Sequence, residues 1–205
     1  RKIGAEVDDA KFWEWFSNAV APALSSGSVP SDEVLSSLDA RMKERGLAWE
    51  IGPNPGGAKE WAFAVSFGGD PDRLSRAAEM VRQAPDLACC RVVLGKQPKE
   101  WDGTLELRVR GSWTVFRTGA WLCRLIPQDD RCIVAVCADA DFEEDEASWS
   151  SAADIAVQSV LGETPYALAV ADVVVVDAVG FDAMPGDAFE LLELGAKIEP
   201  LIAEL

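Results

Sequence analysis

The chain contains no histidine in its 205 residues. Histidine titrates near neutral pH without help from its surroundings and is the commonest metal ligand in proteins. Its absence excludes a Ser/His/Asp triad, a Cys/His pair and a histidine-bearing zinc helix. We therefore expect no catalytic residue set, no metal and no cofactor.

Basic residues are scarce. Nineteen Lys and Arg stand against 35 Asp and Glu, which leaves a formal net charge of −16. A field of this sign opposes binding to nucleic acid and to anionic membranes, and it favours a cationic partner. The few arginines of the strand-rich region are expected to pair with acids on a wet sheet face; they are Arg108, Arg110, Arg117 and Arg124.

No apolar run approaches the ~18 residues of a membrane span, and no secretory leader opens the chain. A cytoplasmic protein without a membrane partner is the expectation. The cysteines are odd in number and form no CxxC motif; they are Cys89, Cys90, Cys123, Cys132 and Cys137. Most lie in apolar, strand-like runs, which is typical of reduced core thiols.

Helical patterns dominate the first half of the chain. Apolar residues recur at helical spacing over 9–24, with a kink or stop at Pro22. Ser31 caps a second helix that Gly46 ends, and Asp70 with Pro71 begins a third. Between these helices, 47–51 and 61–67 are predicted to form a hairpin, and 91–94 a further strand.

Strands dominate the second half. The segments 105–109, 113–117, 121–126 and 132–137 are predicted to form one antiparallel meander. A fourth helix ends at Gly162, and 166–176 forms one buried strand or two strands broken near Asp172. A last helical segment begins at Asp187 and runs through Leu194, with or without a continuation after Gly195. The sequence thus predicts an α+β fold with a mixed or largely antiparallel sheet and helices packed against it. It forms either one continuous domain or two similar α+β halves, 1–100 and 101–205.

Several short segments resemble a pattern found in uncharacterised bacterial proteins. The segment Leu47–Pro53 contains a WEIGP motif, and strand 61–66 and the helix-closing Ala84–Leu87 follow it. Leu161–Glu163 also matches, whereas Gly68–Asp70 departs from the acidic turn usual in that pattern. The resemblance covers about residues 12–101 and implies a bacterial, cytoplasmic protein, with no chemistry attached.

The densest charge cluster precedes the fourth helix. Its members and the nearby Trp149 are the candidate partner-binding residues: Asp139, Asp141, Glu143, Glu144, Asp145, Glu146 and Trp149. Crowded carboxylates repel one another, so a basic protein surface would relieve them. A calcium loop is disfavoured because Glu144 occupies the place of the turn glycine and Ser150 that of the closing glutamate. A solvated loop that supplies acid to the next helix is the plainer interpretation.

Eight tryptophans are many for this length. Tryptophan is enriched at interfaces as well as in cores, and core packing is the favoured interpretation for most of the eight. Partial exposure is the alternative for three that sit beside polar residues, Trp101, Trp113 and Trp149. The leading hypothesis is a non-catalytic acidic binding protein, such as an immunity or inhibitor protein that neutralises a basic toxin. A carboxylate-dependent hydrolase, with or without magnesium, and a homo-oligomeric structural module are the alternatives.

Overall fold

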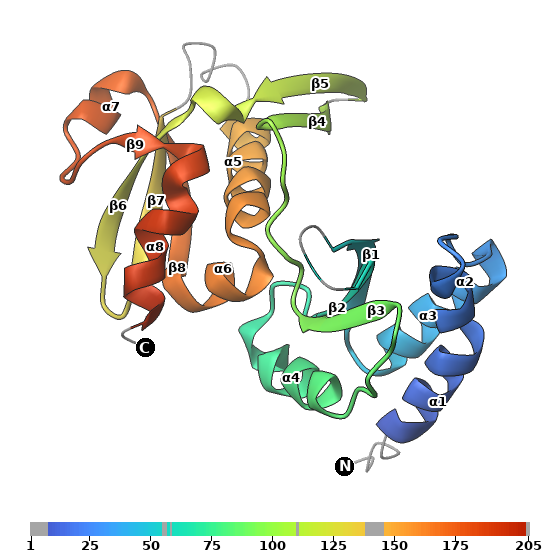
Figure 1. Cartoon of the computed structure of the whole chain (residues 1–205). Coiled ribbons are helices and arrows are strands. Elements are labelled where there is room, and N and C mark those ends of the chain that lie inside the picture. The colour runs from blue at the N-terminus through green and yellow to red at the C-terminus, as the bar shows by residue number, and fades with distance from the viewer. Residues whose placement is uncertain (1–7, 55–56, 58, 110, 138–145, 204–205) are drawn as a thin grey trace, which may run out of the picture. The chain divides into compact units, whose positions relative to one another are not determined.

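The computed structural model describes residues 8–54, 57, 59–109, 111–137 and 146–203. The chain divides into two compact units, Arg1–Lys96 (unit 1) and Gln97–Leu205 (unit 2), which are described separately (Figure 1). Both combine helices with β-sheet, which confirms the predicted α+β fold.

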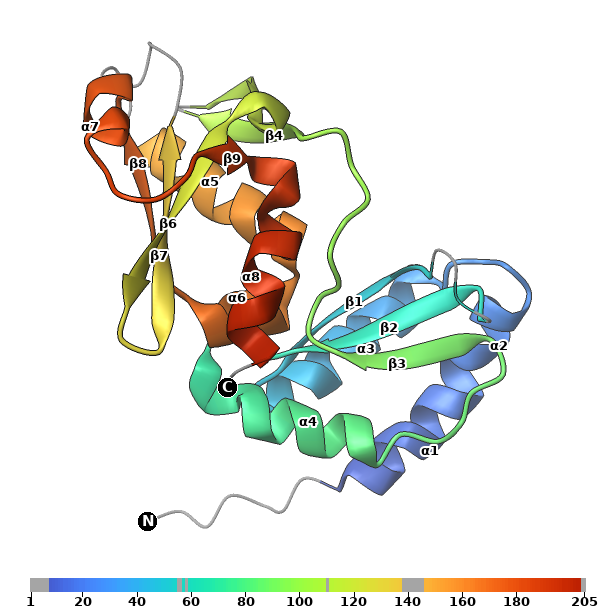
Figure 2. The ribbon, with the colours of Figure 1, turned by 60° about the vertical axis from the view of Figure 1, so that its left-hand side comes forward.

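Unit 1 contains a three-stranded sheet in the order β1-β2-β3 (Figure 2). Strand β2 lies antiparallel to β1 and parallel to β3, and helix α4 carries the chain from β2 to β3. The helices are α1 (Asp9–Ala19), α2 (Ala21–Ser25), α3 (Asp32–Glu44) and α4 (Leu74–Arg82), the last preceded by a 3-10 turn (Pro71–Arg73). The strands are β1 (Ala48–Pro53), β2 (Trp61–Ser66) and β3 (Cys90–Leu94).

The caps expected for unit 1 are present. The side chain of Ser31 accepts a hydrogen bond from Val34 N at the start of α3, and Asp70 accepts one from Asp72 N before α4. The first helix breaks before Pro22, because a proline ring cannot continue the hydrogen-bond ladder. The core forms where the apolar stripe of α1 meets the central strand: the ring of Phe63 lies 4.6 Å from that of Phe16.

A buried carboxylate links three helices of unit 1. Asp9 of α1 accepts two hydrogen bonds of 2.6 Å from Arg76 of α4 and one of 3.2 Å from Arg45 Nε, just after α3. Arg45 also donates to the carbonyls of Arg41 and Asp8, and its guanidinium lies over the ring of Phe12. The negative charge of the Asp9 carboxylate is therefore neutralised by two guanidinium groups, those of Arg45 and Arg76.

Unit 2 contains a four-stranded sheet in the order β8-β7-β6-β9 and a separate hairpin, β4–β5. Strand β6 pairs antiparallel with β7 and β9, and β7 pairs parallel with β8 across a crossover through α5 and α6. The strands are β4 (Thr104–Val109), β5 (Ser112–Arg117), β6 (Leu122–Gln128), β7 (Arg131–Cys137), β8 (Val170–Val176) and β9 (Phe189–Glu190). The helices are α5 (Glu146–Leu161), α6 (Glu163–Ala169), α7 (Ala178–Asp182) and α8 (Leu194–Ala203), with 3-10 turns at Thr118–Ala120 and Leu191–Glu193.

The single meander predicted from residue 105 to 137 is wrong. A 3-10 turn over Thr118–Ala120 separates β5 from β6, so the four strands divide into the β4–β5 hairpin and part of the larger sheet. Gly119 in the sequence predicts a turn between the two strands. It does not show that the chain changes direction there and that β6 joins another sheet.

Two further expectations for unit 2 are corrected. Residues 166–169 belong to helix α6 rather than to a strand, because Gly162 (φ 77°) ends α5 and Pro165 is tolerated in the first turn of a new helix. The last helix does not begin at Asp187. Phe189 and Glu190 instead form β9 against β6, and the helical part follows from Leu191.

The cysteines behave as core residues. Cys90, Cys123 and Cys132 are buried, Cys89 and Cys137 are half-buried, and all five are free thiols. Burial raises the pKa of the Cys123 thiol to about 12 and that of Cys90 to about 11, so both stay protonated at neutral pH. Within the described residues, each helix is too short or too polar to traverse a lipid bilayer.

Candidate functional site

The negative charge of the chain is concentrated in unit 2. Unit 1 carries 12 basic and 14 acidic residues, a net charge of −2, whereas unit 2 carries 7 basic and 21 acidic residues, a net charge of −14. The long-range negative field of the chain therefore originates mostly in unit 2.

The predicted acidic site falls mostly outside the described residues. Asp139, Asp141, Glu143, Glu144 and Asp145 lie there, so their place in the site stays a prediction. Glu146 is exposed at the first residue of α5. Trp149, one turn further on, is half-buried, with its ring 5.3 Å from Phe116 and 5.4 Å from Trp121.

The three tryptophans for which partial exposure is the alternative to core packing differ in their surroundings. Trp101 and Trp149 pack against the core of unit 2. Trp113 instead leaves 73% of its surface in solvent. Among the described residues, Trp113 is the one aromatic residue that is largely exposed, and it lies on the β4–β5 hairpin.

The hairpin has a buried and an open face. Two residues that lie directly opposite each other on β4 and β5 share one face, and successive pairs alternate between the two faces, as the pleat of an antiparallel pair requires. The buried face includes Phe116, Leu105, Leu107 and Val109, which pack against the core of unit 2. The open face, called the hairpin face below, consists of Thr104, Glu106, Arg108, Trp113, Val115 and Arg117.

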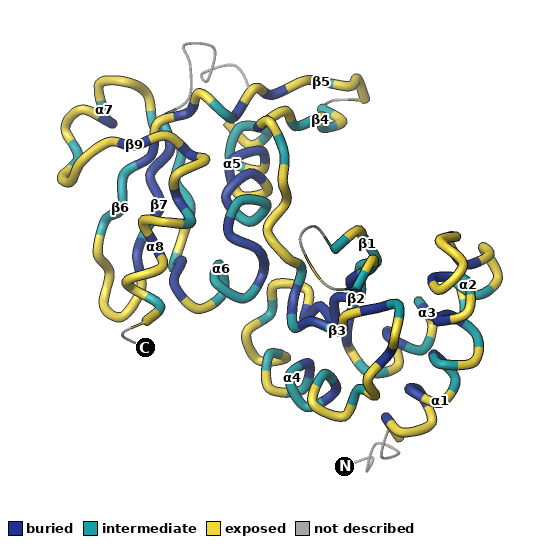
Figure 3. The backbone as a smooth tube through the Cα atoms, in the orientation of Figure 1, coloured by how far each residue is buried: buried dark blue, intermediate teal, exposed yellow. Residues whose placement is uncertain are grey.

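Apolar groups are exposed on the hairpin face. Val115 leaves 52% of its surface in solvent, two residues from Trp113 on the same side of β5. Figure 3 shows β5 as largely exposed, with one buried position at Phe116. Trp113 and Val115 thus form a contiguous exposed apolar area on one face of β5. Contiguous exposed apolar residues mark candidate interaction sites, whereas single ones are ordinary.

The hairpin face also carries unpaired positive charge. Trp113 lies directly opposite Arg108, and Arg117 lies opposite Thr104. The sequence predicts that these two arginines pair with acids, and this prediction is wrong. In the described part of the chain neither Arg108 nor Arg117 makes an ion pair. Arg108 Nε instead donates a hydrogen bond of 3.2 Å to the carbonyl of Gly111. Arginine and tryptophan are the residue types enriched in binding hot spots.

An open hollow of about 450 Å³ continues the hairpin face at its base. Its walls include the charged side chains of Asp102 and Arg117 and the apolar side chain of Val115. The remaining lining residues are Thr104, Gly119 and Ala120. The hollow therefore has an apolar wall and one charge of each sign.

Two glycines fix the base of the hairpin. Gly103 has φ 79°, and a Cβ built on it would lie 2.4 Å from Gly119 N. The carbonyl of Gly103 accepts hydrogen bonds from the backbone N–H (2.7 Å) and the hydroxyl (2.8 Å) of Thr118. This close approach holds the end of β5 next to the start of β4 at the base of the hairpin.

Replacing Gly103 by alanine is expected to loosen the hairpin. A positive φ costs an alanine about 1–2 kcal/mol, and the backbone clash with Gly119 adds about 1–3 kcal/mol. Gly111→Ala is the matched control, since Gly111 has φ 89° but open space around its Cβ position. Amide hydrogen exchange over 104–117 measures both. Equal losses of protection in the two variants would show that the close approach is not what holds the hairpin.

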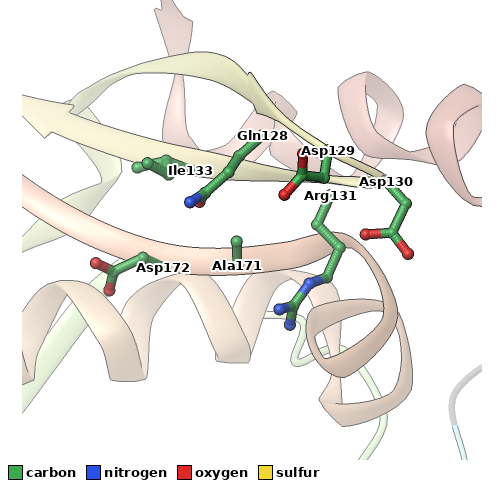
Figure 4. A pocket seen from close by; sticks show the side chains of 7 residues that line it. All are labelled: Gln128, Asp129, Asp130, Arg131, Ile133, Ala171 and Asp172. Carbon is green, nitrogen blue, oxygen red and sulfur yellow. The ribbon is translucent and has the colours of Figure 1, made fainter.

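A second hollow, of about 280 Å³, lies where the β6–β7 turn meets β8 (Figure 4). Its lining residues are Gln128, Asp129, Asp130, Arg131, Ile133, Ala171 and Asp172. Carboxylates from two separate segments thus border one hollow, although Asp172 already accepts a hydrogen bond from Val173 N at 2.8 Å. Across the described residues, no three His, Cys, Asp or Glu side chains are placed to hold a metal ion.

Comparisons with known proteins add no relative. No family model matches the chain, and no curated protein or solved structure matches it significantly. The resemblance to bacterial proteins with a WEIGP strand therefore stays a prediction.

Proposed function

We propose that this protein is a non-catalytic binding protein of the immunity or inhibitor kind, which acts in the cytoplasm and sequesters a basic protein partner. The observation that supports this most is the hairpin face, where a tryptophan is 73% exposed near Val115 and two arginines that make no ion pair with any described residue. Burying such groups in a partner's pocket supplies the few contacts that dominate most interface energies.

Charge contributes at long range. The net charge of −14 on unit 2 attracts a basic partner over distances of about a Debye length, roughly 8 Å at physiological salt, and raises the association rate. The acidic residues before α5 belong to this field, whatever their detailed placement.

The hairpin face acts at contact range. Arg108 and Arg117 are local positive charges on a negative unit, so the partner needs carboxylates opposite them. A partner that is basic overall but acidic at this spot satisfies both requirements, and a partner that is basic throughout does not. This pattern of charges supports selectivity among basic proteins.

Trp113→Ser is expected to reduce partner affinity by at least about 30-fold, since truncating a hot-spot tryptophan costs about 2 kcal/mol or more. Folding stability should change by less than about 0.5 kcal/mol, because the side chain is exposed. Val179→Ser is the control: Val179 is 80% exposed on α7 of the same unit. The immobilised full chain is used to capture partners from a lysate at low and high salt.

The proposal predicts a basic protein retained by the wild type and by Val179→Ser, released by salt, and lost with Trp113→Ser. Retention of the same proteins by all three chains would contradict it.

A carboxylate-dependent hydrolase is the second candidate, and the hollow in Figure 4 is the observation that favours it. Hydrolysis of glycosides requires only two suitably placed acids. Turnover of aryl glycosides or aryl phosphate esters that is abolished by the isosteric change Asp172→Asn would replace the binding proposal with this one.

A further inference from the structure

The strand edges of unit 2 differ in how they are protected. An edge strand presents unpaired backbone N–H and C=O groups, and proteins ordinarily blunt it with charged side chains, bulges, prolines or short length. Strand β9 has two residues. Strand β8 has a register shift near its start, and its backbone binds side chains: Val173 N–H donates to Asp172, and Val170 O accepts from Arg131.

Strand β5 has none of these devices in its interior. It is six residues long, reads Ser-Trp-Thr-Val-Phe-Arg, and pairs on one side with β4. On its other side, no strand or side-chain hydrogen bond reaches it from the described residues. Its sequence is rich in the aromatic and β-branched residues that favour strands, and it contains no proline, glycine or acidic residue.

The hairpin that contains β5 has two strands and is held by packing of its buried face on the core of unit 2. Packing of this kind stabilises a two-stranded hairpin, and a third strand is the other way to do so. Strand β4 contacts α5, so β5 is the strand of this pair that remains open to addition. On the hairpin face, the residues next to this edge are Trp113, Val115 and Arg117.

We infer that the partner docks by adding an extended segment to the free edge of β5. This deepens the proposed function, on which it rests, by naming the element of the partner that is bound. Main-chain hydrogen bonds would supply affinity and alternate side chains specificity. The segment that fits has apolar residues beside Trp113 and Val115 and an acidic residue beside Arg117, in one alternating row.

A second copy of this chain fits the edge less well. Pairing β5 with β5 would place two units of charge −14 next to each other and Arg117 near another cationic hairpin. A strand from a different protein that carries a carboxylate would instead place that negative charge beside Arg117.

The test uses a displayed library of random 12-residue peptides, selected on the full chain. The inference predicts selected peptides with alternating apolar residues, an acid in the same row and no central proline. Binding of a selected peptide should fall at least about tenfold with Trp113→Ser, as the loss of a hot-spot contact implies, and stay unchanged with Val179→Ser.

Backbone chemistry distinguishes strand addition from docking by side chains alone. In a bound strand every second peptide N–H faces β5, so N-methylation of one alternate set should weaken binding at least about tenfold through the loss of two or three hydrogen bonds. N-methylation of the other set should leave binding almost unchanged. In the protein, every second amide over 112–117 should become protected from hydrogen exchange.

Three results would overturn the inference. Peptides that require Trp113 but tolerate both N-methylated sets, and leave β5 amides unprotected, would refute strand addition while the proposed function stands. Concentration-dependent protection of β5 without peptide would make a second copy the occupant. Selection of peptides that bind equally to Trp113→Ser would refute docking at this edge.

Discussion

Replacing Asp9 by alanine is expected to destabilise unit 1 by about 3–5 kcal/mol, the usual cost of removing one partner from a buried ion pair. The side chains of Asp9 and Arg45 are each 5% exposed. Without the carboxylate, the Arg45 guanidinium remains buried between α1 and α3 with no anion beside it, and Arg76 loses both of its 2.6 Å hydrogen bonds.

Asp39→Ala is the control for this variant. Asp39 pairs with Lys43 at 2.7 Å on the exposed side of α3, and such a pair contributes about 0.3–0.5 kcal/mol. Amide hydrogen exchange of unit 1 residues measures the loss of stability in each of the two variants, and it does so independently of the stability of unit 2. If Asp9→Ala cost no more than Asp39→Ala, the buried carboxylate would not be what joins the three helices.

Replacing Phe116 by alanine is expected to detach the hairpin, at a local cost of about 3–5 kcal/mol for a buried aromatic side chain. Phe116 is 6% exposed, and its ring meets that of Trp149 edge to face at 5.3 Å. Because a two-stranded ribbon has little stability of its own, the amides over 104–117 should exchange almost as freely as in a loop, while β6 and β7 stay protected.

Val115→Ala is the matched control in the neighbouring position of the same strand. Its side chain lies on the opposite, open face, so stability should change by less than about 0.5 kcal/mol. The two variants should therefore separate: Phe116→Ala loses the hairpin and partner binding together, and Val115→Ala weakens binding alone. Normal hairpin protection in Phe116→Ala would contradict the packing described here.

Local signals in the sequence predicted much of unit 1. Ser31 and Gly46 bound a helix with both a side-chain cap and a left-handed end, and residues 47–51 and 61–67 form the predicted hairpin. These features depend on neighbouring residues, so one sequence suffices to find them.

Features of unit 2 that depend on distant partners were predicted less well. The apolar residues 166–169 have no periodicity that separates a buried strand from a short helix, and the structure assigns them to α6. Strand β9 exists because Phe189 and Glu190 pair with Cys123 and Leu122 of β6, nearly seventy residues earlier in the sequence. The division of the predicted meander into two sheets likewise depends on where β6 finds its neighbours.

Part of the candidate site can be predicted from the sequence. Trp113 is one of three tryptophans for which partial exposure is the alternative to core packing. The alternation of Leu105, Leu107 and Val109 with Glu106 and Arg108 predicts one buried and one wet face of β4, and the structure confirms it. Within β5 the sequence favours neither face, because Phe116 on one is as apolar as Trp113 on the other. Trp149 packs edge to face on Phe116, and Trp113 stays open.

The function proposed for this chain is the binding of a partner through the hairpin face of its acidic unit. It is tested most directly by titrating the purified basic partner against wild type, Trp113→Ser and Val179→Ser side by side. The account predicts an affinity at least about 30-fold weaker for Trp113→Ser and an unchanged affinity for Val179→Ser. Equal affinities for all three chains would contradict it.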